Sequence, residues 1–193
     1  SLYVGAVCSA QSTASAADLY AYVWRVDQTT LAFGAPIFTT ALNYDRGYVD
    51  NPIEKPAEWL PWVATYPNAF PVNANVPGYP QPILSSIGFD VDGDMILGLR
   101  DRFGDQMGNQ APSNYPPSQT LLSAVTGGEI LRVCATAFDA AQNATAWSLE
   151  NGGKCGVDGA GLTPALAPNG NALDPQGPGN GEFYAGDGWY PPG

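Results

Sequence analysis

The chain has 193 residues, with 7 basic and 18 acidic side chains, a formal net charge of −11 and no histidine. With so few cations we expect no nucleic acid among its partners and no binding to anionic membranes, because both need a basic patch. The missing histidine excludes the Ser–His and Cys–His catalytic arrangements and removes the usual zinc or copper ligand.

Glycine and proline are dense, at 23 and 18 residues, whereas charged residues make up only 13% of the chain. Turn-forming residues at this density favour short strands joined by many loops. We therefore expect an all-β fold without helices, forming a single β-rich domain over residues 1–193. No apolar run approaches the roughly 20 residues that a membrane-spanning helix needs, so no membrane insertion is expected.

Three strands are predicted near the N-terminus. Residues 2–10 and 18–27 are rich in valine, tyrosine and tryptophan and lie between turn-prone segments, which is typical of strands. A third strand is expected over 31–42, where Gly34 and Pro36 indicate a bend or a sheet edge.

Residues 43–82 form a long segment rich in proline and aromatic residues, without strand or helix periodicity. Proline removes backbone donors and blocks helices, so a long ordered loop is expected here. Its rings pack over a sheet in the simpler interpretation. In the alternative, Trp59 and Trp62 form a ligand-binding surface on which glycans stack.

A hairpin is predicted over residues 82–102, with Asp92-Gly93 as a two-residue type I′ turn. Such a turn sets Phe89 opposite Ile96 and leaves apolar side chains on both faces of the hairpin. Because a sheet that is wet on one side shows polar residues there, we expect this hairpin to lie between two other layers.

Three aspartates at alternate positions, Asp90, Asp92 and Asp94, offer carboxylates to a metal ion. Their spacing fails the EF-hand pattern, in which the glycine follows the third acidic ligand. The first interpretation is therefore turn chemistry, with Gly93 as the structural residue. A calcium ion is the alternative, because clustered carboxylates with no cation nearby repel one another.

Arg100, Asp101, Arg102 and Asp105 follow at the end of the hairpin. Arginines that alternate with aspartates can form bidentate ion pairs, so a structural network is expected. The alternative is a hydrolase that uses paired carboxylates. Its candidate carboxylates are Asp90, Asp101, Asp105, Glu129 and Glu182.

A second hairpin with Gly-Gly at its turn is expected over 121–138, followed by a short strand within 144–151. Cys134 and Cys155 flank these strands, and we expect a disulfide between them that leaves Cys8 as the odd thiol. A disulfide fits an oxidising, extracellular compartment.

Two further features lie near the C-terminus. Asn143 opens an Asn-Ala-Thr triplet of the N-glycosylation type. Residues 152–193 are dominated by glycine, proline, asparagine and alanine, and only 181–190 have the composition of a packed segment.

Several strings carry a resemblance to a known family, namely "PQPILSSIGFDVDGDMILGLRDRFGDQMGN", "GGEILRVC", "WSLENGGKCG" and "GPGNGEFYAGD". The chain resembles a propeller-like segment of large bacterial cell-surface proteins, where it is joined to SdrD-type B-like and other adhesin modules. The resemblance implies a β-propeller-like fold and no catalytic residues to carry over. Because a propeller needs about four blades or more, a partial propeller is expected, with a β-sandwich as the alternative.

Together these features predict a non-enzymatic extracellular protein with a structural or adhesive role at the cell surface, in a surface layer or filament. The chain is expected to be a fragment of a larger surface protein. Its expected partners are other copies of itself, other surface proteins and glycans. The alternatives are a calcium-dependent glycan- or protein-binding module and a carboxylate-based glycoside hydrolase.

Overall fold

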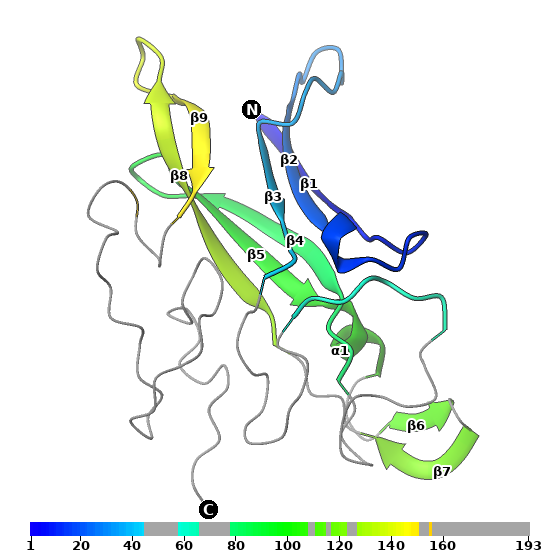
Figure 1. Ribbon diagram of the computed structural model, residues 1–193. Coiled ribbons are helices and arrows are strands. Elements are labelled where there is room, and N and C mark those ends of the chain that lie inside the picture. The colour runs from blue at the N-terminus through cyan, green and yellow to red at the C-terminus, as the bar shows by residue number, and fades with distance from the viewer. Residues whose placement is uncertain are drawn as a thin grey trace, which may run out of the picture.

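The computed structural model describes residues 1–44, 58–65, 78–107, 111–114, 117–122, 127–150 and 155 (Figure 1). The elements in chain order are β1 (Leu2–Cys8), the short 3-10 helix η1 (Ala16–Asp18), β2 (Tyr20–Val26), β3 (Phe38–Ala41), β4 (Pro82–Phe89), β5 (Met95–Asp101), α1 (Arg102–Met107), β6 (Ala111–Asn114), β7 (Pro117–Leu122), β8 (Glu129–Phe138) and β9 (Ala144–Leu149). The all-β class is confirmed, and the six-residue α1 corrects the expectation of no helix. Within these ranges no helix has the length and apolar character needed to cross a bilayer.

Antiparallel pairing connects all the described strands. One sheet has the order β1-β2-β3, a second has the order β4-β5-β8-β9, and β6 pairs with β7. The strands predicted at 2–10 and 18–27 are confirmed as β1 and β2, whereas the third strand is shorter than 31–42. Ahead of β3, Phe33 makes only an isolated bridge to Val26.

The two larger sheets pack against each other over a shared hydrophobic core. Side chains from alternate strand positions point into it, because successive residues of a strand face opposite sides. The core residues on these two sheets are Ala21, Val23, Phe38, Met95, Leu97, Leu99, Leu131 and Val133. The described strands thus form two packed layers with no closed barrel, and the propeller-like arrangement is not confirmed.

Gly5 of β1 allows the two sheets to approach closely. A Cβ atom at this position would lie 2.5 Å from Cδ2 of Leu84 in β4 and 3.2 Å from Cδ1 of Ile87. The rings of Tyr3 and Phe89 join the same two strands, with centroids 4.6 Å apart. The absence of a side chain at Gly5 therefore lets β1 lie against β4.

The β4–β5 hairpin differs from its prediction by one residue. Phe89 pairs with Met95 rather than with Ile96, so a five-residue loop replaces the type I′ turn. Within this loop only Gly93 has a positive φ, at 86°, whereas a type I′ turn needs two such residues.

The change of register also decides which side of the hairpin is covered. On β5 the side chains of Met95, Leu97 and Leu99 are buried. The opposite face is only partly covered at Ile96 and is exposed at Arg100. The expectation that the hairpin lies between two layers is therefore wrong for the described part of the chain, where only one face packs into the core.

The second predicted hairpin is also wrong. β7 pairs with β6, while β8 pairs with β5 on one side and with β9 on the other. The Gly-Gly pair at 127–128 therefore does not join two paired strands. The short strand expected within 144–151 is confirmed as β9.

Some predictions lie outside the described residues. These concern Glu182 and the packed segment expected at 181–190, together with most of the C-terminal segment 152–193. Within the proline-rich segment 43–82, the structure describes residues 43–44, 58–65 and 78–82.

Candidate functional site

The tip of the β4–β5 hairpin is built around the side chain of Asp90. Its Oδ1 accepts hydrogen bonds from the backbone N–H of Asp92, at 2.9 Å, and from that of Asp94, at 3.1 Å. The N–H of Asp90 donates to the Asp94 carbonyl, and the N–H of Gly93 donates to the Asp90 carbonyl. Aspartate favours such turns because its short carboxylate reaches the N–H groups just ahead of it in the chain.

Arg132 of β8 joins this loop to the neighbouring strands. Its Nη2 lies 2.9 Å from Oδ2 of Asp90 and 2.7 Å from Oδ2 of Asp94. Asp94 is 4% exposed, and its Oδ1 accepts a hydrogen bond from the N–H of Ala135 at 2.7 Å. Burial lowers the pKa of Arg132, but the bond to Asp94 and the nearby acidic charges outweigh it and raise the pKa overall. The guanidinium therefore stays charged between the two carboxylates.

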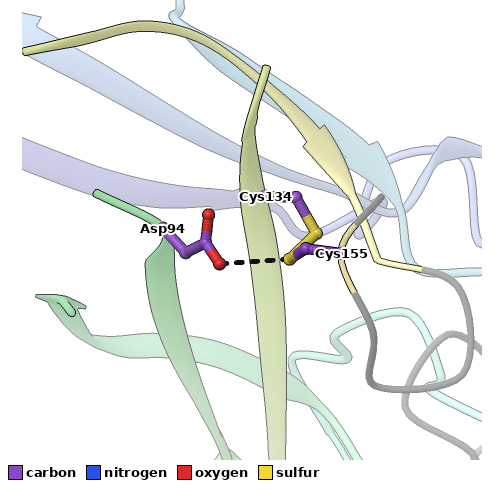
Figure 2. A group of neighbouring side chains, drawn as sticks. All are labelled: Asp94, Cys134 and Cys155. Carbon is purple, nitrogen blue, oxygen red and sulfur yellow. Dashed lines mark hydrogen bonds between the residues drawn. A yellow bond between two sulfur atoms is a disulfide. The ribbon is translucent and has the colours of Figure 1, made fainter. Parts of the chain in front are cut away.

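The disulfide predicted between Cys134 and Cys155 is present and lies beside Asp94 (Figure 2). Sγ of Cys155 is 3.1 Å from Oδ2 of Asp94, the contact that Figure 2 draws as a dashed line. A disulfide sulfur carries no hydrogen, so we interpret this as a close polar contact rather than as a hydrogen bond. One carboxylate oxygen of Asp94 and the two sulfurs lie within 4.8 Å of one another, but sulfurs bonded to each other are not the thiolates that bind metals.

The alternative prediction, a calcium site at Asp90, Asp92 and Asp94, is not supported by this geometry. Its premise was that no cation lies near the carboxylates, and Arg132 contradicts that premise. Both oxygens of Asp90 and both oxygens of Asp94 already accept hydrogen bonds from backbone N–H groups or from Arg132. A calcium ion would have to displace these bonds to reach the oxygen ligands that it needs.

Trp59 is not a stacking surface for glycans, which corrects the ligand-binding prediction at this residue. The side chain is 0% exposed and belongs to the hydrophobic core. Its Nε1 donates to Oε2 of Glu129 at 3.0 Å, and the hydroxyl of Tyr44 donates to the same oxygen at 2.7 Å. The buried carboxylate of Glu129 thus fastens the segment 58–65 to β8.

Trp62 is half-buried at the edge of the second sheet. Its Nε1 donates to the Pro82 carbonyl at 3.0 Å. The guanidinium carbon of Arg102 lies 4.7 Å from the ring centroid, in the geometry of a cation–π interaction. One face of the ring is therefore covered, which leaves Trp62 a poor surface for stacking a sugar.

The network expected at the end of β5 forms only in part. Arg100 and Asp105 make an exposed ion pair. Asp101 instead uses Oδ1 to accept from the N–H of Gln81 and from that of Phe103, both at 2.9 Å, and Arg102 donates to the Gln81 side chain. Asp101 thus holds the first turn of α1, which is a structural role.

A second loop has the same design as the Asp90 loop, and the sequence analysis missed it. Oδ1 of Asp139 accepts from the N–H of Ala141 at 2.8 Å and from that of Asn143 at 2.9 Å. The N–H of Gln142 donates to the Asp139 carbonyl, and Gln142 takes the positive φ, at 63°. The aligned strings "FDVDGD" and "FDAAQN" were the signal that could have found it.

Hydrogen bonding in the second loop also affects the titration of Asp139 and the position of Asn143. The backbone N–H of Asn143 is the largest cause that lowers the pKa of Asp139, followed by the Asn143 side chain. Nδ2 of Asn143 donates to both carboxylate oxygens, at 3.2 and 3.1 Å. The nitrogen that a glycan would modify is therefore held within the loop.

The two loops border a polar hollow of about 420 Å³. Trp147 lines it, and its Nε1 donates to the Gly93 carbonyl at 3.1 Å, which fixes the indole against the first loop. The other aromatic and charged residues that line it are Tyr3, Arg25, Phe89, Asp90, Asp92 and Asp139. Asp90 and Asp139 use both of their oxygens in hydrogen bonds, so these two carboxylates serve the loops that border the hollow.

These observations define a two-layer β module whose acidic and cysteine side chains hold its own hairpins together. Comparison with known proteins finds relatives in Dictyostelium discoideum. The chain is 31% identical to Colossin-A over 185 residues and 28% identical to Colossin-C over 187 residues. These alignments cover 94% and 95% of the chain, but only 1% of Colossin-A and 15% of Colossin-C.

No family model and no solved structure matches the chain. The relatives correct the resemblance drawn from the sequence strings. That resemblance pointed to bacterial adhesin-associated segments, and it is wrong because the matching proteins are eukaryotic. The chain spans only a small part of the relatives that it matches.

Proposed function

We propose that the chain is a non-enzymatic structural module of a much longer extracellular protein. The comparisons support the modular part of this proposal. Nearly the whole chain aligns with two proteins of very different length, since a similar alignment makes up 1% of one and 15% of the other. A unit shared in this way between proteins of different size behaves as a building block.

The observation that carries the structural role is the use of the buried acidic side chains. Asp94 bonds to Arg132 and to the N–H of Ala135, and Asp101 accepts from two backbone N–H groups. Glu129 accepts from an indole and a phenol. Each of these carboxylates joins segments that are distant in sequence, so its bonding serves the fold rather than a reaction.

The disulfide supports an extracellular location, because disulfides persist in oxidising compartments and are rare in the cytosol. Cys8 is exposed and free, which allows a direct test. Intact cells that make the natural protein are treated with a membrane-impermeant maleimide, and the peptides are then analysed with and without reduction. The proposal expects Cys8 to be labelled on intact cells and Cys134 to be labelled only after reduction. Labelling of Cys8 only after lysis would refute the extracellular location.

The adhesive part of the proposal rests on exposed apolar side chains at loop tips. Val91 is 101% exposed and Leu31 is 66% exposed, and a contact between copies would remove this apolar surface from water, which favours association. Self-association is tested by sedimentation of the purified chain over a concentration series, beside Val91→Ser and Leu31→Ser. A monomer at every concentration would remove the support for contacts between copies.

The absence of enzymatic activity is tested separately. The purified chain is incubated with a panel of polysaccharides, and reducing ends are measured over time. Turnover that Asp90→Asn or Asp139→Asn abolishes in a folded protein would overturn the structural role and restore the hydrolase alternative.

A further inference from the structure

The outer face of the first sheet carries a row of aromatic rings. Tyr20, Tyr22 and Trp24 occupy alternate positions of β2 and are half-buried. The ring centroids of Tyr20 and Tyr22 are 6.1 Å apart. The centroids of Tyr22 and Trp24 are 5.5 Å apart, and the planes of these two rings are nearly parallel. Such a row arises because residues two apart in a strand share a face.

The neighbours of this aromatic row are small. On β1, Cys8 lies opposite Tyr20 and Ala6 lies opposite Tyr22. On β3, Thr39 lies on the other side of Tyr22. Side chains of this size leave Tyr20 and Tyr22 open along their flanks, whereas the ring of Phe33 lies edge-on to Trp24, with centroids 6.2 Å apart.

One end of the row borders an open groove of about 890 Å³. Tyr20 and Tyr22 form its aromatic wall, and the loop 9–13 forms its polar wall. The groove residues are Cys8, Ser9, Ala10, Gln11, Ser12, Thr13, Asp18, Tyr20 and Tyr22. They offer hydroxyl and amide groups, which donate and accept hydrogen bonds, the carboxylate of Asp18, which accepts them, and no basic side chain.

The polar wall is held in a defined shape. Ala10 and Ala14 both have a positive φ, at 51° and 53°, which costs energy for residues with a Cβ. The N–H of Ala14 donates to the Ala10 carbonyl at 2.8 Å, and the N–H of Trp62 donates to the Ser9 carbonyl at 2.9 Å. Strained backbone that the surrounding structure fixes in place is found where a protein holds a binding surface ready.

We propose that this groove binds a neutral oligosaccharide, with a sugar ring packed against Tyr20, the end ring of the row, and against the rim of Tyr22, and with the sugar hydroxyls bonded to the loop 9–13. Sugar rings present an apolar C–H face and a rim of hydroxyl groups, which matches an aromatic wall beside a polar one. Asp18 and the net charge of −11 disfavour anionic ligands such as nucleotides or sulfated glycans. The site is distinct from the proline-rich segment, where Trp59 is buried, and it does not depend on the structural role proposed above.

The test measures binding of cellohexaose, xylohexaose, mannohexaose and chitohexaose to the purified chain by isothermal titration calorimetry. We expect at least one of these sugars to bind. The variants Tyr20→Ala and Tyr22→Ala should each weaken that binding by about tenfold or more, equivalent to roughly 1.4 kcal/mol. Tyr22→Phe, which keeps the ring, should retain most of the affinity.

Phe138→Ala is the matched control, because Phe138 is an aromatic side chain that is 48% exposed on a different hairpin. It should leave sugar binding unchanged. Circular dichroism and thermal unfolding establish that each variant is folded. Absence of binding to all four sugars overturns the proposal, and so does binding that the tyrosine variants leave intact. Binding of a proline-rich peptide in place of the sugars, lost in Tyr22→Ala, would identify the groove as a peptide site instead.

Discussion

Arg132 and Asp94 form an ion pair in which Nη2 of the arginine lies 2.7 Å from Oδ2 of an aspartate whose side chain is 6% exposed. The same guanidinium reaches Asp90, so one cation pairs with two of the three aspartates at the hairpin tip. Arg100 and Asp105 form a second pair of the same residue types, with side chains that are 63% and 39% exposed. The protein thus contains a partly buried pair and an exposed pair that can be compared directly.

We predict that Arg132→Met destabilises the protein by about 3 kcal/mol, because it leaves the carboxylate of Asp94 buried without its cation. Arg100→Met should cost less than about 1 kcal/mol, since exposed ion pairs contribute little. Urea denaturation followed by tryptophan fluorescence measures both losses. Equal losses in the two variants would show that Arg132 does not hold the hairpin tip.

The disulfide gives a second prediction. Cys134 and Cys155 are 21 residues apart in sequence, and closing a loop of this size contributes about 3 kcal/mol through the entropy of the unfolded chain. In a Cys8→Ser background, Cys155→Ser should lower the free energy of unfolding by about 3 kcal/mol, which appears as a lower urea midpoint. Cys8→Ser alone should change the midpoint little, because Cys8 is exposed and unbonded. Adding a reductant should lower the midpoint of the Cys8→Ser protein and leave that of the double variant unchanged.

The features that were predicted correctly depend on residues close together in the chain. β1 and β2 follow from dense runs of strand-forming residues, and the disulfide follows from two cysteines that flank a pair of strands. The hairpin register was wrong because Asp92-Gly93 suits a two-residue turn, whereas Asp90 closes a five-residue loop with its side chain. A shift of one residue then changes which side chains share a face.

The features that were missed depend on contacts made only in the fold. Arg132 lies in an apolar strand, and its partner Asp94 is 38 residues away in sequence. Trp59 lies in a proline-rich segment that was predicted as a long ordered loop, and Glu129, 70 residues away, accepts its indole N–H inside the core. Local composition carries no record of such partners, so binding by the carboxylates and by Trp59 and Trp62 stayed open beside the structural interpretations.

The loops closed by Asp90 and Asp139 predict opposite effects of substitution at their positive-φ residues, Gly93 and Gln142. Gly93 has a φ of 86°, and an added Cβ would lie 3.4 Å from Cβ of Ala144. Gly93→Ala should therefore cost about 1–2 kcal/mol, the penalty for a residue with a Cβ in this conformation. Gln142 occupies the equivalent position with a φ of 63°, so Gln142→Gly should be neutral or stabilise the protein by up to about 1 kcal/mol. Thermal unfolding of both variants checks the opposite signs, and destabilisation by Gln142→Gly would argue against the shared loop design.

Two loop aspartates, Asp27 after β2 and Asp139 between β8 and β9, predict how stability depends on pH. Oδ1 of Asp27 accepts hydrogen bonds from the backbone N–H of Thr29 and of Thr30, both at 2.8 Å. Hydrogen bonds from backbone N–H groups, chiefly those of Thr30 and Asn143, lower the pKa of Asp27 and of Asp139 below 3.8. A group whose pKa is lower in the folded state stabilises the protein above its unfolded pKa, near 3.9, and this contribution is lost as the pH falls through the folded value. The melting temperature should therefore fall below about pH 4.

Asparagine can accept the same N–H bonds without titrating, so it isolates the charge. The double variant Asp27→Asn with Asp139→Asn should show a shallower fall of the melting temperature in acid than the natural chain. Asp18→Asn, an exposed aspartate outside these loops, is the matched control and should keep the full slope. If the melting temperature of the double variant falls in acid as steeply as that of the natural chain, these two carboxylates do not cause the pH dependence.

The contact between the two sheets gives the last prediction. A Cβ at Gly5 would lie 2.5 Å from Cδ2 and 2.8 Å from Cγ of Leu84, so Gly5→Ala should cost about 1–3 kcal/mol through overpacking. Gly34→Ala is the control, because a Cβ there would meet nothing within 4 Å. Leu84→Ala removes the clashing atoms, so the double variant Gly5→Ala with Leu84→Ala should be more stable than the sum of the two single losses predicts. Urea denaturation of the four proteins measures this coupling, and strictly additive losses would show that β1 does not press on β4 at this point.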